Sequence, residues 1–319
     1  MIIEIRQQGQ SKKYYLAHSF RYYGDVKKIR RYLGSNLTKK KLEGLRVRAE
    51  QLIREQIQAY KSLRDPLKYE LSAEEFRFLD KLDVKAIIKI KHLTKIEWKR
   101  FTEIFTYNTN AIEGSEMNKK EVIEILEENK WPKEIKKEDI SETYGVAKAI
   151  TYIKETRNHL SVDLIKKLHE IVFKNSKNFA GKLRPSTVEV VIRDSLGNII
   201  HRGAPSNQIL SLLKELVKWY NKHKNKYHPI LLAAVVHNQL ENIHPFQDGN
   251  GRVGRLLLNN ILIKHKMPPV NISLANRREY YGALQEYQNK GNIRPTLDLI
   301  MKEYKTLEKE LGAYKKKRM

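Results

Sequence analysis

The chain contains no cysteine, which excludes a fold held together by disulfides. It also lacks a long apolar run. The longest, Ile230 to Val236, is far below the roughly 18 residues that a bilayer span needs, so no membrane helix is expected. The first residues, Met1 to Arg6, lack the basic and apolar regions of a secretory signal. Because the missing cysteine also fits a reducing compartment, the sequence predicts a cytoplasmic protein without membrane contact.

Acidic residues are scarce beside basic ones. The 319 residues carry 62 Lys and Arg against 37 Asp and Glu, a formal net charge of +25. Nine Lys or Arg accompany one acid, Asp25, between Ser11 and Lys40, and a second basic run closes the chain at Lys315 to Arg318. Basic patches of this kind attract polyanions. With 40% hydrophobic residues the chain can still bury one large core or two modest ones, which excludes global disorder.

Aromatic residues are interleaved with the basic ones between Ser11 and Lys40, and two interpretations stay open. In one, cations hold phosphates and rings stack on bases, as in nucleic-acid-binding proteins. In the other, the aromatic residues favour short strands, Lys13 to Phe20 and Val26 to Leu33, whose basic face is solvated and which a turn at Gly24-Asp25 separates. The aromatic residues are Tyr14, Tyr15, Phe20, Tyr22, Tyr23 and Tyr32.

A long helix follows these strands. From Thr38 onward apolar residues recur every three or four positions, and the helix is predicted to end at Asp65-Pro66, because the residue before a proline avoids the helical region. We therefore expect a small basic α+β module over residues 1–66 and a second domain over residues 67–319.

Helical periodicity dominates the second domain, so the fold is predicted to be mainly α. A capping box at Ser72 to Glu75 indicates one helix start, and Asn118 with Glu121 indicates another. The segment 94–114 carries large apolar residues at helical spacing and ends at a glycine suited to the left-handed conformation past a helix end. Further helices are predicted at about 118–128, 161–173, 207–223, 229–242, 252–265, 277–290 and 296–309.

One segment, at about 186–202, breaks the helical pattern. Its apolar residues alternate with polar ones on both sides of a turn cluster, Asp194 to Asn198. This pattern predicts a β-hairpin.

The residues best suited to chemistry lie together at positions 244–255, which read His-Pro-Phe-Gln-Asp-Gly-Asn-Gly-Arg-Val-Gly-Arg. Gly249 and Gly251 flank Asn250 directly before a helical pattern. Successive backbone N–H groups can therefore turn inward at a helix N-terminus and form an anion-binding nest. A phosphate group is the natural guest of such a nest.

The charged residues around the nest fit a nucleotide. Asp248 supplies a hard carboxylate of the type that Mg²⁺ takes when substrate phosphates also hold it. Arg252 and Arg255 lie three apart on the first helical turn and can fork onto further phosphate oxygens. A neutral His244 could take a proton from an attacking hydroxyl. Together these groups indicate in-line attack on a nucleotide phosphorus.

This segment resembles the signature of the Fic family, His-Pro-Phe-x-(Asp/Glu)-Gly-Asn-Gly-Arg-x-x-Arg, at every specified position. Members typically transfer AMP from ATP to a Ser, Thr or Tyr hydroxyl of a protein. The resemblance implies a protein adenylyltransferase with a Fic-type helical core, with ATP as co-substrate and Mg²⁺ as cofactor. It implies that His244 is the base, that Asp248 holds the metal and that residues 249–251 bind the α-phosphate. Arg252 and Arg255 would take the outer phosphates.

Further parts of the family are similar to segments outside this loop. Ala180 to Arg184 and the hairpin at about 186–202 resemble the flap, an exposed strand that pairs with the backbone of the target and aims its hydroxyl. Tyr280, Tyr281 and Asn289 resemble the adenine and ribose pocket, although the two tyrosines fit core packing equally well. The flap positions that would face the target are Val188, Glu189, Val190 and Val191.

Residues 109–114 resemble the (Ser/Thr)-x-x-x-Glu-(Gly/Asn) motif of the inhibitory helix in Fic proteins. Thr109 and Glu113 are four apart and share one helix face. If Glu113 pairs with Arg255, the guanidinium is occupied and a carboxylate stands where the γ-phosphate should bind. A Glu at the unfavourable end of the helix dipole also indicates a partner. Autoinhibition by Glu113, in a helix over residues 94–114, is therefore expected.

Several questions about function stay open in the sequence. The related Doc branch, which phosphorylates its target, has Lys in place of the second Gly of the loop, so Gly251 favours AMP transfer. Removal of AMP is an alternative, because Glu113 near bound Mg²⁺ could orient a water. A rival function is a nucleic-acid-binding regulator that uses residues 11–40 and keeps the Fic-like core as a nucleotide sensor. The target protein is unknown, and a homodimer stays open.

Overall fold

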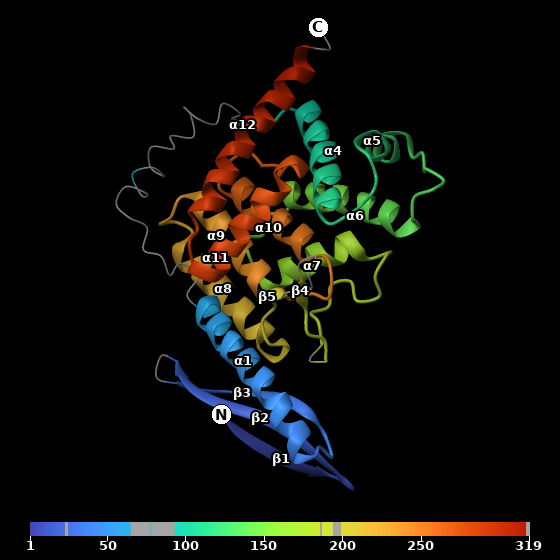
Figure 1. Cartoon of the computed structure of the whole chain (residues 1–319). Helices are drawn as coiled ribbons and strands as arrows, with labels where there is room; N and C mark the ends of the chain where they lie inside the picture. Colours follow the sequence, from blue (N-terminus) through green and yellow to red (C-terminus); the bar gives the residue numbers. More distant parts are fainter. Residues whose placement is uncertain (23–24, 65–76, 78–92, 186, 194–198, 317–319) are drawn as a thin grey trace. The chain divides into compact units, whose positions relative to one another are not determined.

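The computed structural model of the chain (Figure 1) describes residues 1–22, 25–64, 77, 93–185, 187–193 and 199–316. The predicted capping box at Ser72 to Glu75 and the turn at Asp194 to Asn198 lie outside the described residues, as do Gly24, Pro66 and the end of the basic tail. The chain divides into two compact units, Met1–Arg64 and Asp65–Met319.

The N-terminal unit is a three-stranded antiparallel sheet with a helix on one face. Strands β1 (Ile2–Gln8), β2 (Ser11–Tyr22) and β3 (Asp25–Ser35) follow one another in the sheet, and α1 (Lys39–Arg64) comes after them. The sequence analysis did not predict β1. Residues from the strands and the helix share a small core, in which Leu16, Ile29, Ala49 and Ile53 are buried.

The second unit is mainly helical, as predicted, with one short β-hairpin. Its helices are α4 (Lys95–Ile112), α5 (Lys119–Glu128), α6 (Lys137–Glu155), α7 (Val162–Phe173), α8 (Ile209–His223), α9 (Pro229–Ile243), α10 (Asn250–Lys264), α11 (Arg277–Lys290) and α12 (Arg294–Lys316). The hairpin pairs β4 (Val191–Arg193) with β5 (Ile199–Arg202), and two single 3₁₀ turns lie at Ser206–Gln208 and Leu274–Asn276.

Helices α9 and α10 form the centre of this unit. They pack against each other, and α4, α6 and α7 contact α10 while α8, α11 and α12 contact α9 (Figure 1). Nearly all residues of the two helices are buried. The loop that joins them is therefore held by a closely packed scaffold, which keeps the geometry of its side chains fixed.

Local sequence signals explain why most helices begin where they do. The capping box predicted at Asn118 is present, because the Asn118 Oδ1 accepts the Glu121 N–H at 3.0 Å and the Glu121 carboxylate accepts the Asn118 N–H at 2.8 Å. A second capping box joins Thr94 and Glu97 at the start of α4, and Ser161 caps α7 through the Leu164 N–H.

Helix α6 was not predicted. Its N-cap, Lys136, makes no side-chain capping bond, and Gly145 interrupts its interior, so two usual helix signals are missing. The glycine has a packing reason, because a Cβ at Gly145 would collide with the Val172 carbonyl oxygen. The backbone of α6 can therefore approach α7 closely.

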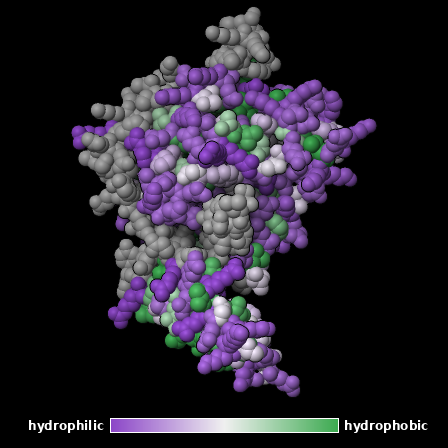
Figure 2. Space-filling model, viewed as in Figure 1, coloured by the Kyte–Doolittle hydropathy of each residue, from purple (hydrophilic) through white to green (hydrophobic). Residues whose placement is uncertain are grey.

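Among the described helices, none combines the length and the apolar composition that a bilayer crossing requires. The face of the molecule in Figure 2 is mostly hydrophilic, with hydrophobic residues interspersed.

Candidate active site

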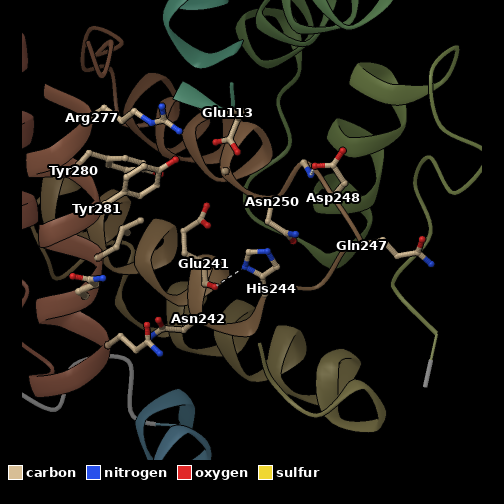
Figure 3. A pocket seen from close by; sticks show the side chains of 15 residues that line it. Glu113, Glu241, Asn242, His244, Gln247, Asp248, Asn250, Arg277, Tyr280 and Tyr281 are labelled. Atoms are coloured by element: carbon tan, nitrogen blue, oxygen red, sulfur yellow. Dashed lines mark hydrogen bonds between the residues drawn. The ribbon is translucent and has the colours of Figure 1, made fainter. Parts of the chain in front are cut away.

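One pocket of about 470 Å³ brings together residues that the sequence analysis singled out in several separate segments (Figure 3). The end of α9, the following loop, the start of α10 and one side of α11 line it, together with the end of α4. The predicted residues that it brings together are Glu113, His244, Asp248, Gly249, Asn250, Gly251 and Tyr281.

The loop between α9 and α10 turns at two residues with left-handed backbone conformation. His244 ends α9 with φ of 51° and Gly249 precedes α10 with φ of 80°. A non-glycine residue rarely adopts such an angle. The backbone of His244 is therefore locally strained, and the contacts around it stabilise this conformation. A Cβ at Gly249 would also collide with the Phe173 ring, so only glycine fits there.

Two side chains fix the shape of this loop. The Asn250 side chain binds the backbone of Phe246 twice, because its Oδ1 accepts the Phe246 N–H at 2.9 Å and its Nδ2 donates to the Phe246 carbonyl at 3.0 Å. The Phe246 ring is fully buried and stacks on His169 with ring centroids 3.9 Å apart. Asn250 therefore holds the loop with its side chain, and its backbone belongs to the start of α10.

His244 faces the pocket beside Asn250 (Figure 3). Its Nδ1 lies 3.2 Å from the Glu241 carbonyl oxygen. A carbonyl only accepts, so Nδ1 carries the proton and the Nε2 lone pair is left as the basic site. Burial lowers the pKa of His244 to about 4 and outweighs the bond to Glu241. The imidazole is therefore neutral at pH 7, the state a general base needs.

Asp248 lines the same pocket and is partly exposed. Its Oδ1 accepts the Gly249 N–H at 2.6 Å, and its Oδ2 lies 3.3 Å from the Lys177 Nζ. Burial alone would raise the pKa of Asp248, but Arg252, Lys177 and the Gly249 amide outweigh it and lower the pKa. The carboxylate is thus ionised and directed by cations at the rim of the pocket.

Arg252 does not line the pocket. It forms a buried ion pair with Glu142 of α6, its guanidinium lies 4.5 Å from the centre of the Phe173 ring, and its Nη2 is 3.7 Å from the Asp248 Oδ1. Glu142, the ion-pair partner of the predicted residue Arg252, thus comes from α6, the helix that was not predicted. In this arrangement Arg252 contacts Asp248 from behind the loop.

Arg255 is almost fully buried, and it donates four hydrogen bonds to Thr109, Glu113 and Tyr280. Its Nε donates to the Thr109 Oγ1 at 2.7 Å, and its Nη2 donates to the Thr109 carbonyl at 3.0 Å and to the Glu113 Oε1 at 2.7 Å. Its Nη1 donates to the Tyr280 hydroxyl at 3.2 Å. Thr109 and Glu113 therefore contact the same guanidinium from one helix face.

The second glycine of the loop stands directly beneath this ion pair. A Cβ at Gly251 would collide with the Glu113 carboxylate and come within 3.0 Å of the Arg255 Nη1. The start of α10 therefore has room for a group the size of a carboxylate. The Glu113 carboxylate occupies this space. A Lys at this position, as in the Doc branch, would not fit this arrangement.

Glu241 is a pocket residue that the sequence analysis did not single out. Its Oε1 is buried and has no hydrogen-bond partner among the described residues, and Figure 3 shows the carboxyl between Glu113 and His244. A Cβ at Gly254 would lie 2.6 Å from that oxygen, so the glycine makes room for it. A signal existed, because Glu241 is the sole Asp, Glu, Lys or Arg of α9.

Glu241 should leave a signature in the pH dependence of stability. Burial and the neighbouring Glu113 carboxylate raise the pKa of Glu241 from 4.5 to about 8. Between these values the folded state holds a proton that the unfolded state has released, so stability falls as pH rises through this window. We expect Glu241→Gln to gain thermal stability over the wild type steadily between about pH 5 and pH 8. Parallel melting temperatures across this range would contradict the assignment.

Arg184 joins the predicted flap to the catalytic loop. Its Nε donates to the His244 carbonyl at 2.7 Å, its Nη1 donates to the Val188 carbonyl at 2.8 Å, and its Nη2 donates to the Ala204 carbonyl. His169 makes a second link, because its Nδ1 accepts the Gly181 N–H and its Nε2 donates to the Asp248 carbonyl. Neither role was predicted from the sequence.

Replacing Arg184 should therefore loosen both the flap and the loop. Arg184→Met removes three charge-assisted bonds and leaves buried carbonyl groups unpaired, so we expect a loss of about 3 kcal/mol in the free energy of unfolding. Urea denaturation measures it. Lys182→Met is the matched control, since Lys182 is exposed two residues away and should change stability by less than about 0.5 kcal/mol. Equal effects of the two substitutions would remove Arg184 from this role.

Of the three residues predicted to bind adenine and ribose, two line the pocket and one does not. Tyr280 and Tyr281 both line the pocket, with Tyr280 buried and bonded to Arg255 and Tyr281 partly exposed and donating to the Ile112 carbonyl at 3.2 Å. Asn289 is exposed and is not part of the lining. Gln285 and Gln288 of the same helix line the pocket instead.

The predicted flap positions lie before and at the start of β4. Glu189 is exposed, Val188 and Val190 are half-buried, and Val191 begins the strand. The Val190 carbonyl accepts the Gly203 N–H at 3.1 Å, so the pairing with the segment after β5 continues one residue before β4 begins.

This helical core, with its glycine-lined loop and short hairpin, defines a class of fold. Residues 159–262 match the Fic/DOC family. The chain is 30% identical over 222 residues to protein adenylyltransferase fic-1 of Caenorhabditis elegans, covering 66% of this chain and 42% of the relative. It is 32% identical over 200 residues to protein adenylyltransferase Fic of Aedes aegypti, covering 61% and 38%. The chain thus spans about two fifths of the length of these relatives.

The solved structures agree with the sequence comparison. A segment of Fic-1 from Caenorhabditis elegans superposes with a TM-score of 0.63 at 25% identity, covering 87% of each chain. A Fic domain protein from Bacteroides thetaiotaomicron shares the fold, with a TM-score of 0.62 at 20% identity. Residues 159–262, which match the Fic/DOC family, include the pocket residues His244 and Asp248 and the glycines at the start of α10.

Proposed function

We propose that this protein transfers AMP from ATP to a Ser, Thr or Tyr hydroxyl of a target protein, and that Glu113 restrains the reaction. The observation that carries the proposal is the position of His244, a neutral imidazole that shares one pocket with the glycine-lined start of α10. The curated relatives at 30% and 32% identity are named protein adenylyltransferases, which supports the same activity.

The chemistry assigns one task to each group. The α-phosphate of ATP lies on the backbone N–H groups of residues 249–251, where the helix N-terminus favours negative charge. The oxygen of the target hydroxyl attacks the α-phosphorus, its proton passes to the Nε2 of His244, and the bond to the β-phosphate oxygen breaks so that pyrophosphate leaves. Arg255 binds the γ-phosphate once Glu113 has left it.

Asp248 fits a magnesium ion as a single carboxylate ligand. It is ionised, partly exposed and on the pocket rim, and Mg²⁺ commonly takes one or two carboxylates together with substrate phosphates and waters. Within the described parts of the chain no cluster of three or more His, Asp or Glu could bind a metal alone, so the phosphates would complete the site. The ion would supply charge neutralisation to the phosphates.

The flap supplies register for the target. Strand β4 begins at Val191, and Arg184 binds the Val188 carbonyl and the His244 carbonyl with one guanidinium, which ties the segment before the strand to the loop. An extended target segment that adds to this strand would be aligned with His244 by backbone bonds, with little demand on its side chains. The target class is therefore a protein with an accessible hydroxyl on an extended or flexible segment.

Transfer of labelled AMP by the Glu113→Gly variant tests this function. The same variant also distinguishes AMP transfer from AMP removal. Removal of AMP would appear as loss of label from a modified target and would need Glu113, whereas AMP transfer improves without it.

A further inference from the structure

The N-terminal sheet has one covered face and one open face. Opposed residues of an antiparallel pair lie on the same face of a sheet. Leu16 and Ile29 point toward α1 and form the core of the unit, so their neighbours on each strand point away from α1. We call this second side the open face. It consists of the even positions 2–8 of β1, the odd positions 13–21 of β2 and the even positions 26–32 of β3.

The open face is strongly basic. It carries five cations and one acid, Glu4, so its formal charge is far more positive than that of a mixed surface. The cations come from all three strands and extend along most of the length of the sheet. They are Arg6, Lys13, Arg21, Lys28 and Arg30.

Glu4 organises these cations. Its carboxylate contacts Lys28, lies 2.8 Å from the Arg30 Nε and 3.8 Å from the Arg6 Nη2. The side chains of Arg6 and Arg30 remain 54% and 46% exposed, so they are positioned without being covered. Donors held in this way lose less conformational freedom when they bind phosphates or base edges.

The two tyrosines of the open face distinguish between kinds of nucleic acid. Tyr15 and Tyr32 contact each other with ring centroids 5.3 Å apart, and the Arg6 guanidinium lies 5.4 Å above the Tyr15 ring. Tyr15 is half-buried between these neighbours, and only Tyr32, which is 52% exposed, offers a ring to a splayed base. Proteins that bind single strands stack successive bases on several aromatic rings, so a single exposed ring favours a duplex.

The dimensions of the sheet also fit a duplex. Three strands spaced about 4.8 Å apart span about 10 Å, close to the roughly 12 Å width of the major groove of B-form DNA. Strand β2 has 12 residues, which extend over about 40 Å, slightly more than one helical turn of DNA. The major groove of A-form RNA is too narrow and deep for such a sheet.

We propose that the open face of the N-terminal sheet binds the major groove of double-stranded DNA. Its cations hold phosphates on both sides of the groove, and the arginines reach the base edges between them. The site is separate from the pocket of the Fic domain, and it gives the protein a place on DNA that does not depend on ATP.

Fluorescence polarisation with a duplex of about 20 base pairs, full-length protein and no nucleotide tests this proposal. We expect the logarithm of the association constant to fall with the logarithm of salt concentration with a slope of about −4, because each neutralised phosphate contributes about −0.9. The triple variant Arg6→Ala, Arg21→Ala, Lys28→Ala should bind at least about tenfold more weakly, with a slope that is smaller by 2 to 3.

The matched control removes the same charge elsewhere on the unit. Lys39, Lys40 and Lys41 are exposed at the start of α1, and their triple change to Ala should leave affinity within about threefold of the wild type. If the triple variant of the open face does not fold, the single variant Arg21→Glu, at an exposed site, tests the same prediction and should also weaken binding. Equal losses in the two triple variants would overturn the proposal. Binding to single-stranded RNA or to phosphatidylserine vesicles in preference to the duplex would overturn it as well.

Discussion

Glu113→Gly is expected to raise the transfer of label from ATP labelled at the α-phosphate by about tenfold to a hundredfold. The Glu113 carboxylate holds the Arg255 Nη2 at 2.7 Å, and a charge-assisted bond of this kind is worth about 1.5–3 kcal/mol. Removing it frees the guanidinium for the γ-phosphate and also clears the space above Gly251. Incorporation of label into the protein itself and into a cell lysate measures the effect.

The control for this variant is Glu116→Gly. Glu116 is an exposed acid three residues along the chain and lines no part of the pocket, so its removal should leave transfer at the wild-type level. If a folded Glu113→Gly protein labels neither itself nor the lysate, the proposed activity is wrong. If both variants rise equally, the contact with Arg255 is not the restraint.

His244→Ala, made in the Glu113→Gly background, should lower transfer by about a hundredfold to ten-thousandfold, the usual contribution of a general base. The imidazole accepts the proton of the target hydroxyl and does not hold the triphosphate, so binding of ATP should be unchanged. Calorimetric titration with ATP measures binding, and transfer of the α-label measures the chemistry.

His223→Ala in the same background is the matched control. His223 lies at the end of α8, outside the pocket, and its substitution should leave transfer within about twofold. Because burial keeps the pKa of His244 at about 4, transfer should also persist at pH values where an ordinary histidine is already protonated. Full transfer by the His244→Ala protein would show that another group takes the proton.

The sequence was most informative where chemistry and local structure coincide. Residues 244–255 are neighbours in the chain, so the order of His, Asp, Gly and Arg already dictates which groups meet at a helix start. Thr109 and Glu113 were predictable for the same reason, since a spacing of four places both on one helix face. The pairing of Glu113 with Arg255 was a hypothesis that followed the family resemblance, and the two side chains lie 2.7 Å apart. The contact of Thr109 with the same guanidinium was not predicted.

The parts of the site that the sequence did not predict depend on contacts between segments that are far apart in the chain. Glu142 pairs with Arg252 through a helix whose start has no side-chain cap, and no local pattern indicates that pairing. Glu241 could be recognised as an isolated charge in a buried helix, but its position beside Glu113 follows from the packing of α9 against α10. Asn289 was predicted for the nucleotide pocket but is exposed, whereas its neighbour Gln288 lines the pocket. Helical spacing alone does not distinguish these two positions.

The direct test of the central claim is the fate of each part of ATP in the Glu113→Gly reaction. ATP labelled in turn at the adenine, the α-phosphate and the γ-phosphate is added with cell lysate, and the modified peptides are identified by mass spectrometry. The account predicts that adenine and α-label arrive together on a Ser, Thr or Tyr oxygen while the γ-label leaves as pyrophosphate. Arrival of the γ-label on protein without adenine would show that the pocket presents the wrong phosphorus to His244.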